Sequence, residues 1–142
     1  MTVKLTPYFN MEGNAREAIE FYKQALGAEV LSIITYGEMP GMPNTFTDDL
    51  KNLVAHAKLR VGESELMFSD APTGSTIPKG KQVTICISTD NVEKSKRFFE
   101  ALRQNGHVNM PFGEEAFSPG FGDVTDKFGV TFQIYTESEN ES

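Results

Sequence analysis

The chain carries an internal repeat, and this repeat restricts the possible folds more than any other feature of the sequence. Two predicted helices align at one constant offset, because Asn14 matches Asn91 and the pair 21–22 matches the pair 98–99. Each helix follows one predicted strand and precedes three others. A repeated order of elements is typical of tandem modules. The sequence therefore predicts an α+β fold built from two paired βαβββ modules.

The strands are predicted from alternation of apolar and polar residues with a period of two. They cover residues 5–11, 29–37, 53–61 and 64–70 in the first half and 82–88, 107–112, 121–125 and 130–135 in the second half. Apolar residues at helical spacing predict helices over 15–26 and 92–102.

The ends of these helices carry recognisable signals. For the first helix we expect a capping box of Asn14 and Glu17 at the start, and Gly27 in the left-handed position at the end. For the second helix, Asp90 or Asn91 is the expected N-cap and Gly106 is the expected stop.

The domain organisation follows from these elements. We predict a first module over residues 1–70, a linker over 71–80 that is dense in Pro, Gly and hydroxyl residues, and a second module over 81–136. The polar and acidic tail 137–142 is predicted to be disordered. The segment Met39–Asn52 is the longest irregular connection, and it is either a loop that closes over a ligand or a plain solvent-exposed link.

Composition excludes several classes of partner. The net charge is −7, and the basic residues are scattered rather than clustered, so we predict no nucleic-acid binding. No apolar run approaches the roughly 20 residues that cross a bilayer, and the N-terminus lacks a secretory apolar region. The single cysteine, Cys86, excludes an internal disulfide framework. We therefore predict a cytoplasmic protein without membrane association.

One face of each predicted half-sheet is apolar and suits helix packing, whereas the other face is mixed in polarity. We expect the two mixed faces to curve around a shared cavity that holds a small molecule. Its soft and aromatic side chains favour an apolar or aromatic ligand. The side chains predicted to contact that ligand are Phe9, His56, Met67, Ser69, Thr84, Cys86, Phe121, Gln133 and Tyr135.

This arrangement, with the segments Pro7–Tyr22, His56–Ala57, Met67–Pro72 and Thr125–Val130, resembles the vicinal oxygen chelate superfamily of glyoxalase I, bleomycin-resistance proteins and extradiol dioxygenases. Within it, these segments are similar to the PhnB-like branch, whose members are often labelled as 3-demethylubiquinone 3-methyltransferase-like. The resemblance implies the paired βαβββ fold and a homodimer. Methyl transfer needs a cofactor site, and the sequence has no glycine-rich turn after a strand, so no cofactor is predicted.

The same resemblance implies four positions at which metal-dependent members hold a divalent ion with His and Glu. By our alignment these positions carry Pro7, Met67, Thr84 and Gln133. Proline, methionine and threonine are unsuited to a hard or borderline cation, and glutamine offers a neutral carbonyl oxygen. We therefore predict no metal ion.

Three functions remain open. The first is a metal-independent protein that binds a small molecule. The second is a glyoxalase-like lyase or isomerase that uses His56 as general base, with Gln133 and Thr84 orienting an oxygen. The third is sequestration of a toxic aromatic compound. Bland alternatives also stay open: His56 satisfied by backbone groups, Cys86 as a buried filler, and Gln133 bonded to Thr84.

Overall fold

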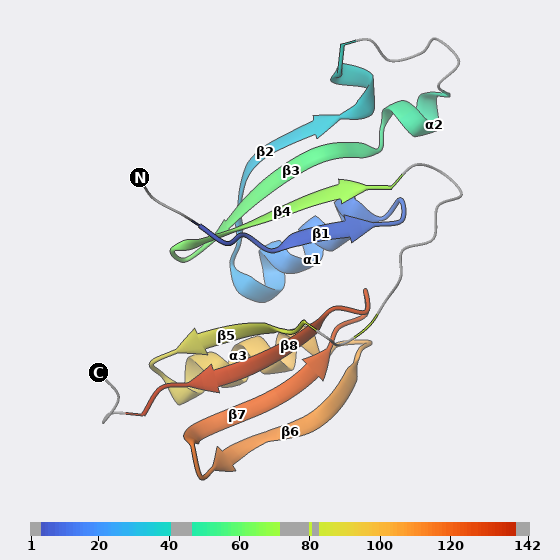
Figure 1. The fold of residues 1–142 in the computed structure, drawn as a ribbon. Helices are drawn as coiled ribbons and strands as arrows, with labels where there is room; N and C mark the ends of the chain where they lie inside the picture. The colour runs from blue at the N-terminus through green and yellow to red at the C-terminus, as the bar shows by residue number, and fades with distance from the viewer. Residues whose placement is uncertain (1–3, 41–46, 72–79, 81–82, 139–142) are drawn as a thin grey trace. The chain divides into compact units, whose positions relative to one another are not determined.

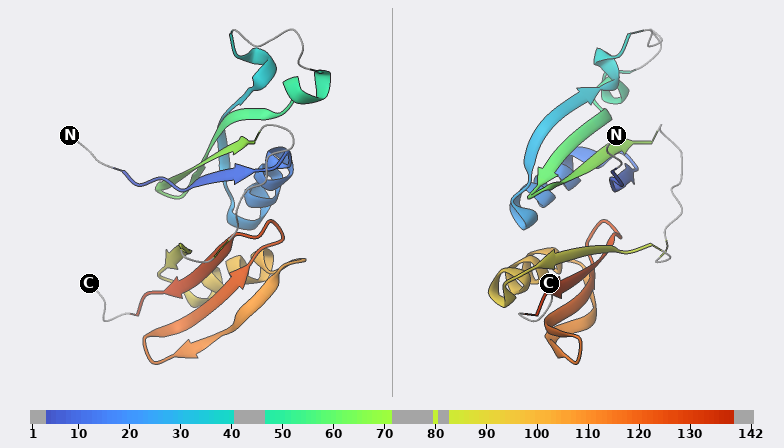
Figure 2. Two further views of the ribbon diagram at one scale, coloured as in Figure 1. Left: turned by 45° about the vertical axis from the view of Figure 1, so that its right-hand side comes forward. Right: turned by 60° about the vertical axis from the view of Figure 1, so that its left-hand side comes forward.

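The computed structural model describes residues 4–40, 47–71, 80 and 83–138. The chain divides into two compact units, residues 1–78 and 79–142, and each is taken here by itself. Each unit has one four-stranded sheet with one long helix along one face (Figures 1 and 2). The predicted α+β fold of paired βαβββ modules is confirmed. Most of the predicted linker and the end of the predicted tail lie outside the described residues.

The first unit contains β1 to β4 with α1 between β1 and β2. The elements are β1 (Tyr8–Met11), α1 (Ala15–Leu26), β2 (Glu29–Thr35), the 3₁₀ turn η1 (Tyr36–Glu38), α2 (Asp48–Lys51), β3 (Val54–Val61) and β4 (Ser64–Asp70). The strand order is β1-β4-β3-β2, with β1 parallel to β4 and the other pairs antiparallel.

The second unit repeats this topology. Its elements are β5 (Ile85–Thr89), α3 (Val92–Leu102), β6 (His107–Glu115), β7 (Ser118–Thr125) and β8 (Thr131–Thr136). The strand order is β5-β8-β7-β6, with β5 parallel to β8 and the remaining pairs antiparallel. None of the helices in the described part of the chain has both the length and the apolar character needed to span a membrane.

The helix of each unit covers an apolar sheet face. In the first unit, Phe68 of β4 lies with its ring centroid 4.7 Å from that of Phe9 and 5.8 Å from that of Tyr22 on α1. In the second unit, Phe99 of α3 packs against Gly122 of β7, where an added Cβ would lie 2.6 Å from the Phe99 ring. The opposite face of each sheet, turned away from its own helix, is here called the distal face.

Asp70 ties three backbone segments of the first unit together. Its side chain is buried at the end of β4, and its Oδ1 accepts hydrogen bonds from the N–H groups of Gly13 (3.0 Å) and Ala15 (2.9 Å). Its Oδ2 accepts a third hydrogen bond from the N–H of Val54 at 2.9 Å. Asp70 therefore caps α1 and fixes the start of β3 at the same time.

Thr136 occupies the matching place at the end of β8 in the second unit. Its hydroxyl is buried and lies 2.7 Å from the carbonyl oxygen of Gly120 at the start of β7, and 2.8 Å from the hydroxyl of Ser95 on α3. The hydroxyl of Ser118 donates to the backbone oxygen of Thr136 at 2.7 Å. Buried hydroxyls thus connect helix and strands here, where the first unit uses a carboxylate.

The helix caps differ from expectation in two places. Asn14 makes no capping hydrogen bond, and its side chain accepts instead from the N–H of Glu12, while Asp70 accepts from the N–H of Ala15, the first residue of α1. The expected capping box is therefore wrong. The second helix ends at Leu102 and the left-handed residue after it is Asn105, so Gly106 is not the stop. Asn91 and Gly27 act as predicted.

Three connections and strand ends also differ from expectation. Residues 113–120 were expected to form a loop, but β6 and β7 extend through them and turn at 116–117. A strand from residue 82 was expected, but β5 begins at Ile85 and the side chain of Val83 is 84% exposed. Within the segment expected to be irregular up to residue 52, the short helix α2 forms with Thr47 as its cap. Residues 41–46 lie outside the described part, so closure of this segment stays a prediction.

We predict that replacing Asp70 with alanine lowers the free energy of unfolding by about 3–5 kcal/mol, because three backbone N–H groups, from two buried hydrogen bonds and one part-buried one, lose their acceptor. Urea unfolding followed by circular dichroism measures this loss. Asp90→Ala is the matched control, since Asp90 is exposed before α3 and should change stability by no more than about 0.5 kcal/mol. Equal effects in the two variants would contradict the capping role.

Candidate functional site

The distal face of the first sheet carries three of the predicted ligand contacts. Met67 and Ser69 alternate on β4 with the buried residues Leu66 and Phe68, so they point away from α1. Met67 lies between Tyr8 of β1 and Lys58 of β3 in the strand register, and His56 shares the face of Lys58. Tyr8 is exposed and the other four side chains are half-buried, which leaves all of them accessible to a ligand.

Phe9 does not belong to this group. It pairs with Phe68 in the register and is buried under α1, where its ring lies 5.4 Å from that of Tyr22. The structure therefore places Phe9 in the helix-facing core, opposite the face on which it was expected. We leave it out of the candidate site.

His56 is half-buried on the distal face. Its ring centroid lies 6.2 Å from that of Tyr8, and the imidazole makes no hydrogen bond with any described residue. Backbone groups of the described residues therefore do not satisfy it. Its ring nitrogens are therefore available to donate or accept a hydrogen bond with a bound molecule.

Tyr36 is a residue that the sequence reasoning missed. It follows β2, and its phenol donates a hydrogen bond to the backbone oxygen of Asp70 at 2.8 Å. Burial raises the pKa of the Tyr36 phenol above its ordinary value, and the nearby Asp70 and Tyr8 raise it further. The phenol therefore stays protonated and holds η1 against the end of β4. No motif marks such a contact, because it joins two segments that are distant in the sequence.

The distal face of the second sheet carries the remaining predicted contacts. Cys86 of β5 pairs with Gln133 of β8, and Phe121 of β7 pairs with Tyr135 of β8. Thr84 stands just before β5 on the same alternation as Cys86. Cys86 is exposed, so its expected role as a buried filler is wrong. Gln133 makes no side-chain hydrogen bond with Thr84 or any other described residue.

Three aromatic rings gather at one end of this face. The Phe117 ring lies edge-on to that of Phe121, with centroids 5.0 Å apart, and parallel to that of Tyr135, with centroids 6.5 Å apart. The Tyr135 hydroxyl donates to the backbone oxygen of Phe117 at 3.3 Å, which fixes the hairpin end over β8. We call Phe117, Phe121 and Tyr135 the aromatic cluster. Phe117 is 52% exposed, so the cluster offers apolar surface to solvent.

A polar network continues from the aromatic cluster along the same face, and the sequence reasoning missed it as well. The Nδ2 of Asn109 on β6 donates to Asp123 Oδ1 and to Thr125 Oγ1 of β7, each at 3.0 Å. The Thr125 hydroxyl lies 2.9 Å from that of Thr131 on β8. Asp123 pairs with Gln133 in the register, so a carboxylate and an amide lie side by side. Only strand pairing reveals this neighbourhood.

The strand register also shows which side chains stand beside Met67 and Gln133, two of the four positions that the resemblance implies as metal ligands. Tyr8, rather than Pro7, pairs with Met67, and Cys86, rather than Thr84, pairs with Gln133. A phenol, a thioether, a thiol and an amide do not match the His and Glu sets that hold divalent ions in this kind of fold. Among the described residues, no three His, Cys, Asp or Glu side chains come together as metal ligands. The residues present do not fit the superfamily's metal ion.

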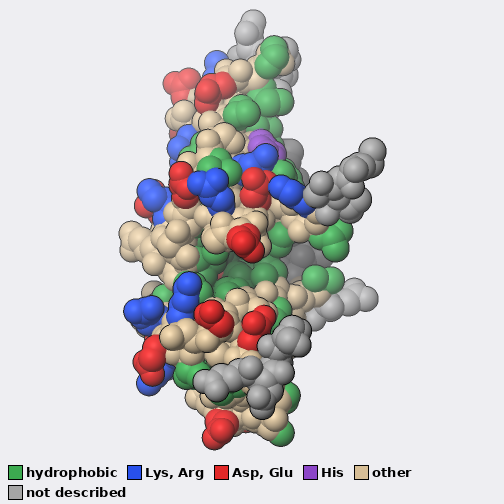
Figure 3. Space-filling view, turned by 90° about the vertical axis from the view of Figure 1, so that its left-hand side faces the viewer, with side chains coloured by type: hydrophobic (Ala, Val, Ile, Leu, Met, Phe, Trp, Pro, Cys, Tyr) green, Lys and Arg blue, Asp and Glu red, His purple; other side chains and the backbone are tan. Residues whose placement is uncertain are grey.

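The charged side chains on the face of the molecule in Figure 3 do not form a surface that would favour an anionic partner. Acidic and basic groups are interspersed there with hydrophobic ones, without one basic patch. Several described charges are paired locally, such as Lys58 with Glu65 at 3.9 Å and Arg60 with Glu29. Exposed pairs of this kind contribute little to stability.

Comparisons with known proteins place this geometry in context. The family model for the Glyoxalase/Bleomycin resistance protein/Dioxygenase superfamily matches residues 10–134. Protein YjdN of Escherichia coli (strain K12) is 38% identical in an alignment 138 residues long, which covers 92% of this chain and 92% of that protein. Protein PA1353 from Pseudomonas aeruginosa superimposes with a TM-score of 0.84 at 32% identity, covering 96% of this chain and 98% of that one. The PhnB protein from Bacillus cereus does so with a TM-score of 0.77 at 27% identity, covering 94% and 99%.

Proposed function

Because the chain belongs to the Glyoxalase/Bleomycin resistance protein/Dioxygenase superfamily, with relatives of the PhnB and YjdN type, we propose that it binds a small molecule without the superfamily's metal ion. The ligand contacts lie on the distal faces of the two sheets. Members of the superfamily bind small molecules, and this chain would do so without the metal ion that serves other members as a Lewis acid.

The main support for this proposal is the kind of side chain found at the register-paired positions of the first and last strands of each unit. Metal-dependent members of the superfamily hold the ion with His and Glu on the first and last strands of each module, and the register pairs on those strands here are Tyr8 with Met67 and Cys86 with Gln133. A thioether and an amide are weak ligands for hard cations. Within each unit, the register pair is well suited to contact an organic molecule: Tyr8 and Met67 offer aromatic and soft surface, and Cys86 and Gln133 offer soft and hydrogen-bonding surface.

Unengaged polar groups on the distal faces support ligand binding further. The side chains of Gln133 and His56 make no hydrogen bond with any described residue. Each offers donor and acceptor sites that a ligand can satisfy. The predicted contacts that we retain are His56, Met67, Ser69, Thr84, Cys86, Phe121, Gln133 and Tyr135.

A second candidate is a metal-independent lyase or isomerase of the glyoxalase type, with His56 as general base. The observation that favours it is the unengaged imidazole of His56 beside the Tyr8 ring. A general base must reach the proton that it abstracts, and an imidazole free of backbone bonds is available for that role. A third candidate, sequestration of an aromatic compound, shares the binding step and lacks turnover.

The main proposal predicts that metal-stripped protein titrated with Mn²⁺ or Ni²⁺ in a calorimeter shows no site of one ion per chain. The physical reason is the weak donor set at the four paired positions. Cys86→Ser serves as the control that separates incidental binding by the thiol. A stoichiometric site that disappears in Met67→Ala or Gln133→Ala would overturn the proposal.

For the enzymatic candidate, we predict that His56→Ala lowers kcat for the isomerisation of the methylglyoxal–glutathione hemithioacetal by roughly 10²-fold or more. Unfolding free energy should change little, since the imidazole has no bonded partner among the described residues. His107→Ala is the matched control, because His107 is exposed on β6. Absence of turnover in the parent protein, or equal turnover in His56→Ala, removes this candidate.

We also propose that the chain forms a homodimer, as its resemblance to the superfamily implies. Each unit taken by itself has a large apolar side chain that is 40% exposed on an edge strand, Ile34 on β2 and Met110 on β6, and exposed apolar surface of this kind supports association. Sedimentation velocity should give a mass twice that of the 15.7 kDa chain. A monomer at micromolar concentration is the contrary result.

A further inference from the structure

Asp123 occupies the middle of the second sheet. It lies on β7, which has β6 on one side and β8 on the other, and its register partner on β8 is Gln133. Gly122 and Val124, its neighbours along the strand, belong to the helix-facing side, since Gly122 contacts the Phe99 ring and Val124 is fully buried. Asp123 therefore points to the distal face, among the proposed ligand contacts.

Within the described part of the chain, the carboxylate of Asp123 has one hydrogen-bond donor and no cation. Asn109 Nδ2 donates to Oδ1 at 3.0 Å, and none of the ion pairs between described residues includes Asp123. Its second oxygen has no hydrogen-bond donor among the described residues. A half-buried carboxylate retains most of its acceptor capacity in this arrangement.

Gln133 adds a second acceptor at the same place. Its amide makes no hydrogen bond with a described residue, so its carbonyl oxygen is available beside the Asp123 carboxylate. A molecule that donates hydrogen bonds or carries positive charge can be contacted by both oxygens. An anionic molecule would be repelled by the carboxylate.

The aromatic cluster begins at the next register pair on the same face. That pair is Phe121 with Tyr135, which lies two residues, or about 7 Å, along the strands from Asp123 and Gln133. Phe117 lies against both rings and is 52% exposed. Aromatic faces attract cations through their quadrupole, and the rings also supply apolar contact area.

From this juxtaposition we infer that the distal face of the second sheet binds an organic cation with an apolar or aromatic body. Asp123 and Gln133 contact the cationic group, and the aromatic cluster contacts the body. This inference rests on the proposed small-molecule function and specifies the chemical class of its ligand. The negative charge of the chain as a whole, −7, favours the approach of such a ligand.

Three probes of similar size test the inference: benzyltrimethylammonium as the cation, benzyl alcohol as the neutral probe and benzoate as the anion. Each is titrated into the full chain while amide chemical shifts are followed by NMR. We expect the cation to bind about tenfold more tightly than benzyl alcohol, and benzoate to bind most weakly. Shifts should concentrate at Gln133, Tyr135 and Phe117.

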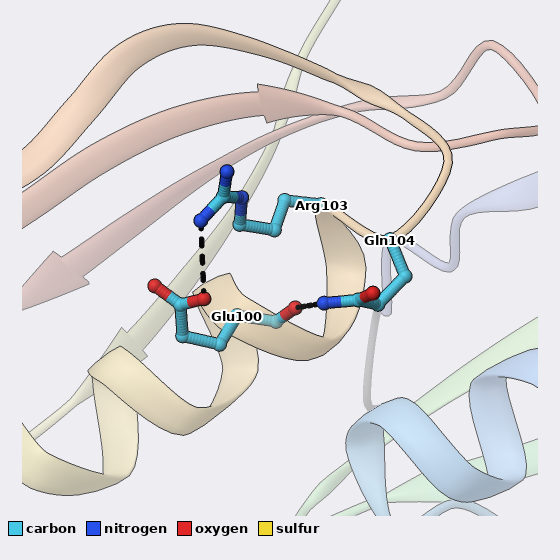
Figure 4. A network of polar contacts seen from close by, with 3 residues as sticks. All are labelled: Glu100, Arg103 and Gln104. Atoms are coloured by element: carbon cyan, nitrogen blue, oxygen red, sulfur yellow. Dashed lines mark hydrogen bonds and ion pairs between the residues drawn. The ribbon is translucent and has the colours of Figure 1, made fainter.

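Asp123→Asn is the test variant, because its amide oxygen can still accept the hydrogen bond from Asn109. The preference for the cation over benzyl alcohol should fall from about tenfold to about twofold or less. Glu100→Gln is the matched control. This substitution also removes one negative charge, but from the exposed surface of α3. The Glu100 carboxylate is paired there with Arg103 at 3.3 Å, and its backbone oxygen accepts from Gln104 (Figure 4).

Different outcomes would contradict the preference for an organic cation and the binding of small molecules in general. Binding of benzyl alcohol at the aromatic cluster with no preference for the cation, or an unchanged preference in Asp123→Asn, overturns the inference and leaves small-molecule binding standing. Shifts for no probe at either distal face would count against small-molecule binding by both sheets. Thermal unfolding of Asp123→Asn shows whether the fold is intact, and Tyr135→Leu, which removes one ring, gives an independent variant expected to weaken the cation more than the alcohol.

Discussion

The buried carboxylate of Asp70 is the interaction on which the first unit depends. It accepts hydrogen bonds from the start of α1 and from the start of β3, and it stands at the end of β4. Buried backbone N–H groups need acceptors, so one side chain satisfies three such groups that no strand ladder reaches. Its backbone oxygen also accepts from Tyr36. The helix, the sheet and the turn beside the distal face are therefore positioned by one residue.

The second unit solves the same problem with neutral groups. Thr136, Ser118 and Ser95 form a buried chain of hydroxyls that joins β8, β7 and α3. Hydroxyls both donate and accept, so such a chain can satisfy carbonyl oxygens as well as N–H groups. The two modules share a topology and diverge in the chemistry that closes it. The two modules therefore share the backbone arrangement more than the side chains that hold it.

At the distal faces, the side chains also differ from those that bind metal ions in the superfamily, although the fold is the same. Pairing in the sheets brings Tyr8 beside Met67 and Cys86 beside Gln133, and this set is unsuited to the divalent ions that the superfamily uses. What the faces present instead are an aromatic cluster together with an imidazole, an amide and a carboxylate; among the described residues, the imidazole and the amide have no hydrogen-bond partner and the carboxylate has no ion-pair partner. These groups support the proposal that the chain binds an organic molecule.

The amino-acid sequence by itself determined the two βαβββ modules, since apolar periodicity and the matched helices 15–26 and 92–102 are local signals. It also identified Met67, Gln133 and Tyr135 as distal-face residues, because alternation along one strand is local too. Tertiary structure decided that Phe9 is core, that Asp70 rather than Asn14 caps α1, and that Asp123 lies beside Gln133. Those outcomes depend on strand register and on contacts between distant segments, which no spacing along the chain encodes.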